Sequence, residues 1–134
     1  MRSRCYNFSN RVLLNREATL KGIDFARSLV HTLEDKKAEN IVLLDIQGHS
    51  VFTDYFVICT GTSERQLDAL AEALDEVGHK KHRRKAPRVE GHAAGGWILM
   101  DFGEVIVHLF SAEQRKRYRL EELWREGKVI LRIQ

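Results

Sequence analysis

Three residues of the chain have types and an order that suit phosphoryl transfer by two metal ions. Gly48 and Ser50 fit a glycine-serine turn, and the carboxylate of Asp54 follows them as a possible metal ligand. Two-metal chemistry needs a second carboxylate, placed two residues later on the same face of the strand. That position is Phe56, whose ring cannot bind Mg²⁺, and Asp101 alone cannot rebuild the site. We therefore predict no catalytic residues and no enzyme activity.

Other candidate ligands and nucleophiles lack the partners that their chemistry requires. His79 and His82 have no third ligand at a suitable spacing, so we predict neither a metal site nor a cofactor. Ser63 does not match a nucleophile elbow, because Arg65 stands where the second glycine belongs. Cys59 lies in a strongly apolar run, which favours a buried, unreactive thiol.

A basic run occupies residues 79–88, where six of ten residues are Lys or Arg and none is acidic. Such a cluster attracts phosphate groups, and binding of this kind weakens as the salt concentration rises. The run contains no aromatic residue that could stack on bases, so a solvated loop is the alternative. The candidate phosphate or RNA contacts are Lys80, Lys81, Arg83, Arg84, Lys85 and Arg88.

Trp97 follows a glycine-rich loop and begins an apolar segment. If that segment is a strand, Trp97 and Leu99 share one face while Ile98 and Met100 share the other. One set can then pack in the core while the other faces outward. An exposed Trp is typical of residues that anchor a protein interface, and packing in the core is the alternative.

The elements that position these residues are predicted from the spacing of apolar residues. Residues 1–18 are predicted to be an N-terminal extension, because residues 1–16 contain four Arg and no acid, a composition that also fits a short organelle-targeting segment. From Thr19 the spacing is helical, and residues 41–46 and 55–60 read as buried strands. Ser63 and Gln66 form a capping box for a second helix, which Gly78 is expected to end in a left-handed conformation.

The second half of the chain is predicted to form a hairpin and a last helix. A short strand near residues 88–89 precedes two apolar strands, 97–100 and 105–110, joined by a short turn. Ser111 caps a helix that Gly127 ends, and residues 127–134 form a C-terminal tail that is either an edge strand or frayed. The expected fold class is α/β, a compact mixed sheet of about five strands flanked by helices.

Length and composition fit one globular domain. The chain has 134 residues, with 22 Lys and Arg against 19 Asp and Glu. No apolar run approaches the roughly 20 residues that a membrane-spanning helix needs, so no membrane association is expected. Only two cysteines, Cys5 and Cys59, occur, which fits a reducing compartment and a cytoplasmic location.

Motifs spread over residues 53–124 resemble the ribosomal silencing factor (Iojap) family, and the resemblance covers residues 19–126. In order, the motifs are Thr53-Asp54-Tyr55-Phe56-Val57-Ile58, Thr60-Gly61-Thr62-Ser63, Val89-Glu90-Gly91, Gly96-Trp97, Asp101, Gly103, Val107-His108 and Tyr118-Arg119-Leu120-Glu121-Glu122-Leu123-Trp124. Residues 78–89 are longer and more basic than is usual in the family, and residues before Thr19 and after Gly127 have no counterpart in the resemblance.

Membership of this family would imply a nucleotidyltransferase-like fold without the catalytic site, and a homodimer. It would also imply binding to large-subunit ribosomal protein fourteen, which sterically blocks joining of the small subunit and represses translation when nutrients are short. Trp97 matches a family Trp that contacts this ribosomal protein. Together with its neighbours, Trp97 gives the expected partner-binding residues, which are Trp97, Met100, Asp101 and Phe102. A nucleotidyltransferase-like enzyme and a free-standing RNA-binding module are the alternatives.

Overall fold

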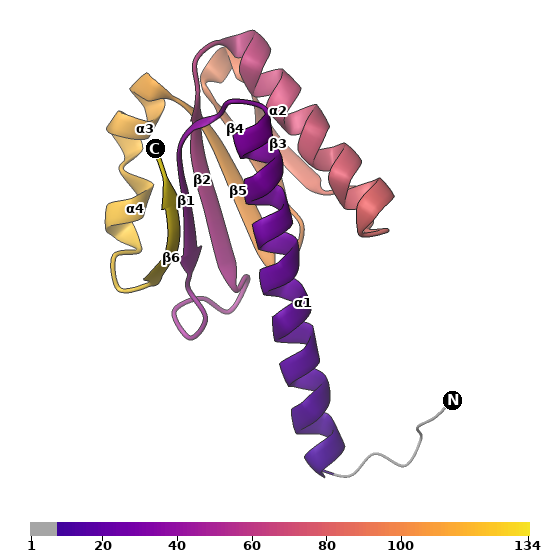
Figure 1. Ribbon diagram of the computed structural model, residues 1–134. Coiled ribbons are helices and arrows are strands. Elements are labelled where there is room, and N and C mark those ends of the chain that lie inside the picture. Colours follow the sequence, from indigo (N-terminus) through magenta and orange to yellow (C-terminus); the bar gives the residue numbers. More distant parts are fainter. Residues whose placement is uncertain (1–7) are drawn as a thin grey trace.

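The computed structural model describes residues 8–134, with side chains from residue 22 onward. Within these residues, six strands form one sheet in the order β3-β4-β5-β2-β1-β6 (Figure 1). The strands are β1 (Glu39–Asp45), β2 (Tyr55–Gly61), β3 (Arg88–His92), β4 (Trp97–Asp101), β5 (Val105–Ser111) and β6 (Lys128–Ile133). Neighbouring strands are antiparallel except β2 and β5, which are parallel. The prediction of a mixed α/β fold is confirmed.

The sixth strand comes from the C-terminal segment, for which the sequence allows either an edge strand or a frayed tail. β6 pairs with β1, so that Ile41 lies opposite Ile133 and Leu43 lies opposite Leu131. The described sheet therefore has one strand more than the predicted number of about five. The sequence left this segment undecided because apolar and polar residues alternate only weakly in residues 127–134, and because its pairing partner, β1, lies far away in the sequence.

Two helices cover one face of the sheet. They are α1 (Phe8–Asp35) and α2 (Glu64–Glu76). Both place a leucine-rich stripe on the strands, which buries Phe25, Leu29, Leu33, Leu67, Leu70 and Leu74. α1 begins at Phe8 and not at Thr19, so the helix includes residues that the sequence places in the N-terminal extension.

A second, smaller apolar cluster lies on the opposite face. Side chains alternate along β2, so that Val57 packs under α1 and α2 whereas Phe56 and Ile58 belong to the opposite cluster. This cluster is partly covered by α3 (Ala112–Tyr118), α4 (Leu120–Leu123) and the residue that follows them, through Leu120 and Trp124. The two faces of the sheet are therefore covered by different parts of the chain.

Two helix ends differ from their predicted form. Gly78 does not adopt a left-handed conformation, because α2 continues into a π-helical turn, Val77–Lys81, and the positive φ of 53° falls on Arg83. A small residue suits position 78 for another reason: an added Cβ would lie 3.1 Å from the ring of Phe102. The last helix is interrupted at Arg119, whose φ is 46°, so α3 and α4 are separate.

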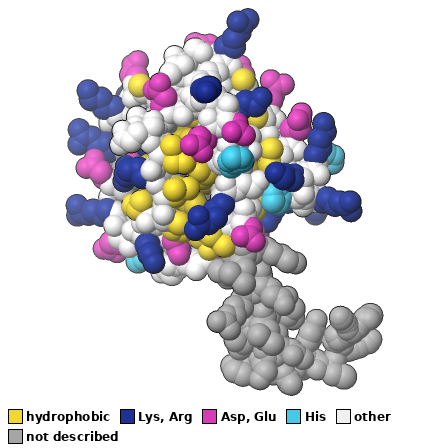
Figure 2. Space-filling model, in the orientation of Figure 1, with side chains coloured by type: hydrophobic (Ala, Val, Ile, Leu, Met, Phe, Trp, Pro, Cys, Tyr) yellow, Lys and Arg dark blue, Asp and Glu magenta, His cyan; other side chains and the backbone are white. Residues whose placement is uncertain are grey.

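The surface is mixed in character. Figure 2 shows hydrophobic side chains near the middle of the viewed face, with Lys and Arg side chains distributed around its rim. Among the residues that the structure describes, no helix combines the length and the hydropathy that crossing a membrane would require.

Candidate functional site

The first residue of β4, Trp97, lies on the sheet face opposite α1 and α2. Burial alternates along this strand: Trp97, Leu99 and Asp101 are half-buried, whereas Ile98 and Met100 are buried under the two helices. The predicted division of the strand into two faces is therefore confirmed. Met100 is only 1% exposed. In this conformation its side chain packs in the core, and its role in partner binding stays a prediction.

Trp97 is held among aromatic side chains. Its ring centroid lies 4.9 Å from that of Phe110 and 4.7 Å from that of Tyr118. The indole Nε1 donates a hydrogen bond to Nδ1 of His108 at 3.2 Å. Aromatic contacts continue from His108 to Phe56 and from Phe56 to Trp124. We call this set the aromatic face; it comprises Phe56, Trp97, His108, Phe110, Tyr118 and Trp124.

Leu99 and Tyr118 extend the aromatic face to the surface around Trp97. Leu99 is half-buried, and Tyr118 is 46% exposed. Elsewhere, at the end of α4, Leu123 is 74% exposed. The alternation of Leu99 with Trp97 predicted one member of this surface. Tyr118 was missed, because only the tertiary position of α3 brings its ring against Trp97 of β4.

The other predicted partner-binding residues do not gather around Trp97. Asp101 shares its face but accepts a hydrogen bond from the backbone N–H of Gly103 at 2.8 Å, which stabilises the hairpin turn. Phe102 turns to the opposite side, where its ring packs edge-on against Phe25 with 5.1 Å between centroids. Trp97 is therefore the centre of the candidate surface, and Phe102 belongs to the packing of α1 in this conformation.

A shallow hollow lies between β3 and β4 beside Trp97. It has a volume of about 220 Å³ and is lined by Glu90, Gly91, Trp97 and Leu99. Gly91 has a φ of 80°, and an added Cβ would lie 2.2 Å from the carbonyl oxygen of Trp97. Glycine is required here because the two strands approach too closely for a side chain.

His108 is the buried polar residue of the aromatic face. It is 4% exposed, and burial lowers its pKa from 6.5 to about 4. Because Nδ1 accepts the indole hydrogen bond, the neutral ring carries its proton on Nε2, and Nε2 has no partner within the described residues. The imidazole is therefore neutral across the physiological range of pH.

Burial of His108 gives a pH dependence of stability. The unfolded chain binds a proton at this residue below about pH 6.5, but the folded chain does so only near pH 4, so stability falls as the pH decreases through this window. Between pH 7 and pH 5 we expect the parent protein to lose roughly 1.5 to 2 kcal/mol more of its free energy of unfolding than His108→Leu loses. Urea unfolding at the two pH values measures this difference, and equal losses in both proteins would contradict it.

The basic run is only partly available for contact with phosphate. Lys80, Lys81, Arg83, Lys85 and Arg88 are exposed. Arg84 is 22% exposed in its side chain, pairs with Glu104, and places its guanidinium 3.8 Å from the centroid of the Phe25 ring. These contacts hold the run against α1 and the hairpin, so Arg84 is less available for phosphate than its neighbours, and its phosphate contact stays a prediction.

The residues considered for phosphoryl transfer do not form a metal site. Phe56 fills the position of the second carboxylate and packs its ring between His108 and Trp124. The pKa of Asp54 is raised by burial and, to a smaller extent, by the nearby carboxylates of Glu104 and Asp45. Within the described part of the chain, no group of three His, Cys, Asp or Glu residues could hold a metal ion.

Cys59 is a buried thiol, as predicted. It is fully buried in β2, and burial raises its pKa to about 12. The thiolate that would attack a substrate is therefore essentially absent at neutral pH.

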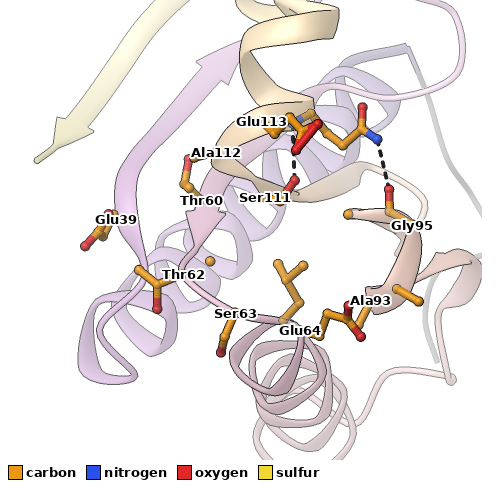
Figure 3. A pocket seen from close by; sticks show the side chains of 15 residues that line it. Glu39, Thr60, Thr62, Ser63, Glu64, Ala93, Gly95, Ser111, Ala112 and Glu113 are labelled. Atoms are coloured by element: carbon orange, nitrogen blue, oxygen red, sulfur yellow. Dashed lines mark hydrogen bonds between the residues drawn. The ribbon is translucent and has the colours of Figure 1, made fainter.

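A crevice of about 470 Å³ opens at the carboxyl ends of β2 and β5, where the chain leaves toward α2 on one face and α3 on the other (Figure 3). The predicted caps are confirmed there: Ser63 and Ser111 accept hydrogen bonds from the backbone N–H groups of Gln66 and Gln114. Open sheets often bind ligands at such a point. The charged side chains that line this crevice are Glu39, Glu64 and Glu113, which Figure 3 shows spread around it. Phosphate groups would be repelled.

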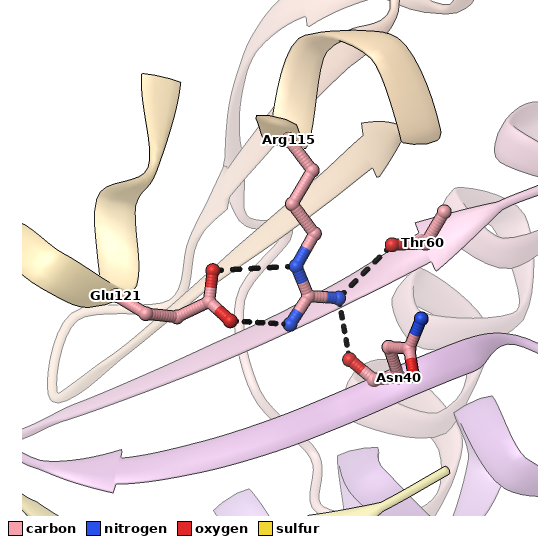
Figure 4. Close-up of polar contacts among 4 residues, drawn as sticks. All are labelled: Asn40, Thr60, Arg115 and Glu121. Carbon is pink, nitrogen blue, oxygen red and sulfur yellow. Dashed lines mark hydrogen bonds and ion pairs between the residues drawn. The ribbon is translucent and has the colours of Figure 1, made fainter. Parts of the chain in front are cut away.

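One arginine joins the C-terminal helices to the sheet. Arg115 of α3 donates hydrogen bonds to both carboxylate oxygens of Glu121, at 3.3 and 2.7 Å, and to Oγ1 of Thr60 at 3.0 Å (Figure 4). It also donates to the backbone carbonyl of Asn40. These contacts fix α3 and α4, and therefore Tyr118, relative to β1 and β2.

Comparison with known proteins gives one consistent family. The family model described as "Ribosomal silencing factor during starvation" matches residues 19–134. The match includes residues 127–134, for which the sequence motifs gave no counterpart. A protein of Halalkalibacterium halodurans named ribosomal silencing factor RsfS is 39% identical over 101 residues, which cover 75% of this chain and 86% of the relative.

A mouse protein and a solved structure agree with this match. The mouse protein, named mitochondrial assembly of ribosomal large subunit protein 1, is 37% identical over 72% of this chain and 43% of its own length. A crystal structure of a protein from Chromobacterium violaceum is 33% identical, with a TM-score of 0.70, and the match covers 75% of this chain and 83% of that one.

Proposed function

Because this chain belongs to the ribosomal silencing factor family, we propose that it binds the large ribosomal subunit and represses translation. In this proposal the protein contacts large-subunit ribosomal protein fourteen and sterically blocks joining of the small subunit. The names of its relatives support a role on the ribosome, and the mouse relative is named for the large subunit. Action by binding needs a surface and not a catalytic centre.

The observation that carries the proposal is the aromatic face. Interfaces are anchored by a few large side chains, with Trp and Tyr prominent among them. Here Trp97 is half-buried, Tyr118 is 46% exposed, and the centroids of the two rings lie 4.7 Å apart. Held in place by neighbouring rings, these side chains would lose little conformational freedom on binding, which favours affinity.

Sedimentation with purified ribosomal subunits tests the proposal. The protein should pellet with large subunits and should lower the yield of joined ribosomes when small subunits are added. Recovery with small subunits only, or normal joining at saturating protein, would refute it. The mass of the free protein in solution tests the homodimer that the family resemblance implies.

Two other functions have less support. A nucleotidyltransferase-like enzyme would need a second carboxylate at position 56, where the ring of Phe56 packs in the aromatic face. A free-standing RNA-binding module would rely on the basic run, which offers exposed charges but no base-stacking aromatic residue. Hydrolysis of nucleoside triphosphates with Mg²⁺, or tight binding to isolated RNA, would favour one of these instead.

The exposed part of the basic run is expected to touch ribosomal phosphate groups. Changing Lys80, Lys81, Arg83 and Lys85 to Gln should slow association with large subunits and flatten its salt dependence. The slope of log K against log salt should fall by about 0.7 to 0.9 for each phosphate group that the variant no longer neutralises. Arg84 is left unchanged, since it pairs with Glu104. Equal salt slopes for the variant and the parent would show that the basic run does not contact ribosomal phosphate groups.

A further inference from the structure

His108 is an unusual residue to find in the middle of an apolar surface layer. Its ring lies 4.8 Å from that of Phe56, 5.9 Å from that of Trp97 and 6.1 Å from that of Phe110. No charged group of the described residues contributes to its pKa, which is shifted by burial alone. Its Nε2 lies buried without a hydrogen-bond partner within the described residues. An unpaired buried donor is costly, and a leucine would fill this position without that cost.

The second ring nitrogen of His108, Nδ1, explains why a histidine occupies this position. In the β4–β5 hairpin, Trp97 lies opposite Phe110 and Leu99 lies opposite His108. Trp97 and His108 are therefore diagonal neighbours, at a distance that only long side chains can bridge. The indole leans across this diagonal and donates its single N–H to Nδ1 of His108.

This hydrogen bond completes the restraint of the indole. Phe110 and Tyr118 contact the Trp97 ring and are tilted to it by 33° and 47°. These contacts limit the movement of the ring, but they do not set the direction in which its N–H points. A hydrogen bond has a direction, and it selects one rotation of the ring.

We propose that His108 is a positioning residue, whose Nδ1 holds the indole of Trp97 in the orientation that meets the ribosomal partner. This inference rests on the proposed function, because it assigns His108 a role at the same surface. His108 itself is buried and need not touch the partner. It acts by removing conformational freedom that Trp97 would otherwise lose on binding.

A histidine that only satisfies the indole N–H within the fold would have different consequences. Its loss would destabilise the protein and would affect binding only through unfolding. A positioning role predicts the opposite pattern, in which binding weakens although stability is kept. His108→Leu removes the unpaired Nε2–H but leaves the indole N–H of Trp97 without its acceptor. These two effects oppose each other, so the unfolding midpoint should change little.

Three variants separate these roles. His108→Leu should weaken binding to purified large subunits about tenfold. His108→Asn places an amide oxygen near the position of Nδ1 and should restore most of that affinity. In a Trp97→Phe background, which lacks the N–H donor, His108→Leu should change binding less than twofold, since there is no hydrogen bond to lose.

A fluorescence measurement tests the geometry without ribosomes. Trp97 and Trp124 are the two tryptophans of the chain, so Trp124→Phe leaves Trp97 as the single reporter. Its emission should shift to the red and be quenched more readily by acrylamide after His108→Leu, and His108→Asn should reverse both changes.

The possible results distinguish failure of the positioning role of His108 from failure of the proposed function. Binding of His108→Leu within twofold of a parent that binds well, or unchanged Trp97 emission, overturns the positioning role and leaves the proposed function intact. A decrease in binding that is proportional to a lowered unfolding midpoint also overturns it. A parent protein that does not bind large subunits overturns the proposed function first and this inference with it.

Discussion

Trp97→Ala is expected to weaken binding to purified large ribosomal subunits by at least about 2 kcal/mol, which is roughly a thirtyfold increase in Kd. The indole of Trp97 is a large side chain that is half-buried against Phe110 and Tyr118. Its removal would delete contact area with the partner and also loosen the exposed ring of Tyr118. The first effect removes contacts from the complex, and the second increases the conformational freedom that Tyr118 loses on binding.

The same substitution has a cost in the free protein, because part of the indole is already buried. We expect a decrease of about 1 to 2 kcal/mol in the free energy of unfolding, the scale of a partly buried aromatic contact. Binding is therefore measured by sedimentation or by surface-immobilised subunits at a temperature where circular dichroism shows every variant folded. Under that condition, unfolding cannot account for a thirtyfold change.

Trp124 provides the matched control. It lies on the same sheet face and packs against Phe56 at the far end of the aromatic contacts. If the partner is centred on Trp97, Trp124→Phe should bind within about twofold of the parent. Trp97→Ala with parental affinity would exclude the surface described above, and an equal decrease in both variants would place the contact elsewhere on this face.

The parts of the fold that sequence predicts well are those decided by neighbouring residues. Ser63 and Ser111 act as caps because a side chain three residues from its partner meets it in the first turn of any helix. The two faces of β4 follow from the alternation of side chains, so the sequence correctly separated Trp97 from Met100. The sequence could not decide which face of β4 would be covered, because α1 and α2, which cover it, lie far from β4 along the chain.

The features that the sequence left undecided depend on distant contacts. Arg84 is one charge among six in the basic run, and only the fold brings it to Glu104 and to the ring of Phe25. β6 was ambiguous because its strand partner is β1 at the opposite end of the chain. The pairing of Trp97 with His108 could have been found, since the predicted hairpin already makes them diagonal neighbours once its register is known.

The position of Tyr118 on the aromatic face depends in turn on Arg115. Its side chain is 12% exposed, and the bidentate pair with Glu121 closes α3 onto α4. Bonds to Thr60 and to the carbonyl of Asn40 connect the same guanidinium to β2 and β1. Burial raises the pKa of Glu121, but the hydrogen bond and the charge of Arg115 outweigh it, so the pKa lies below its usual value.

Arg115→Ala is therefore expected to lower the free energy of unfolding by about 3 kcal/mol, because it leaves a partly buried carboxylate and two acceptors without their donor. Arg115→Lys should recover less than half, since an ammonium cannot match the two oxygens of Glu121 and reach Thr60 as well. Arg117→Ala, an exposed arginine of the same helix, should stay within about 0.5 kcal/mol of the parent.

Urea unfolding near neutral pH measures these differences, and repeating it in acid tests their origin. Glu121 has a lowered pKa in the folded protein, so its contribution is present above the ordinary carboxyl pKa and is lost as the pH falls through the folded value. The deficit of Arg115→Ala should therefore shrink in acid, where the carboxylate no longer needs a cation. A deficit below about 1 kcal/mol, or one that does not change with pH, would mean that the aliphatic stem of Arg115, and not its charge, holds α3 and α4 on the sheet.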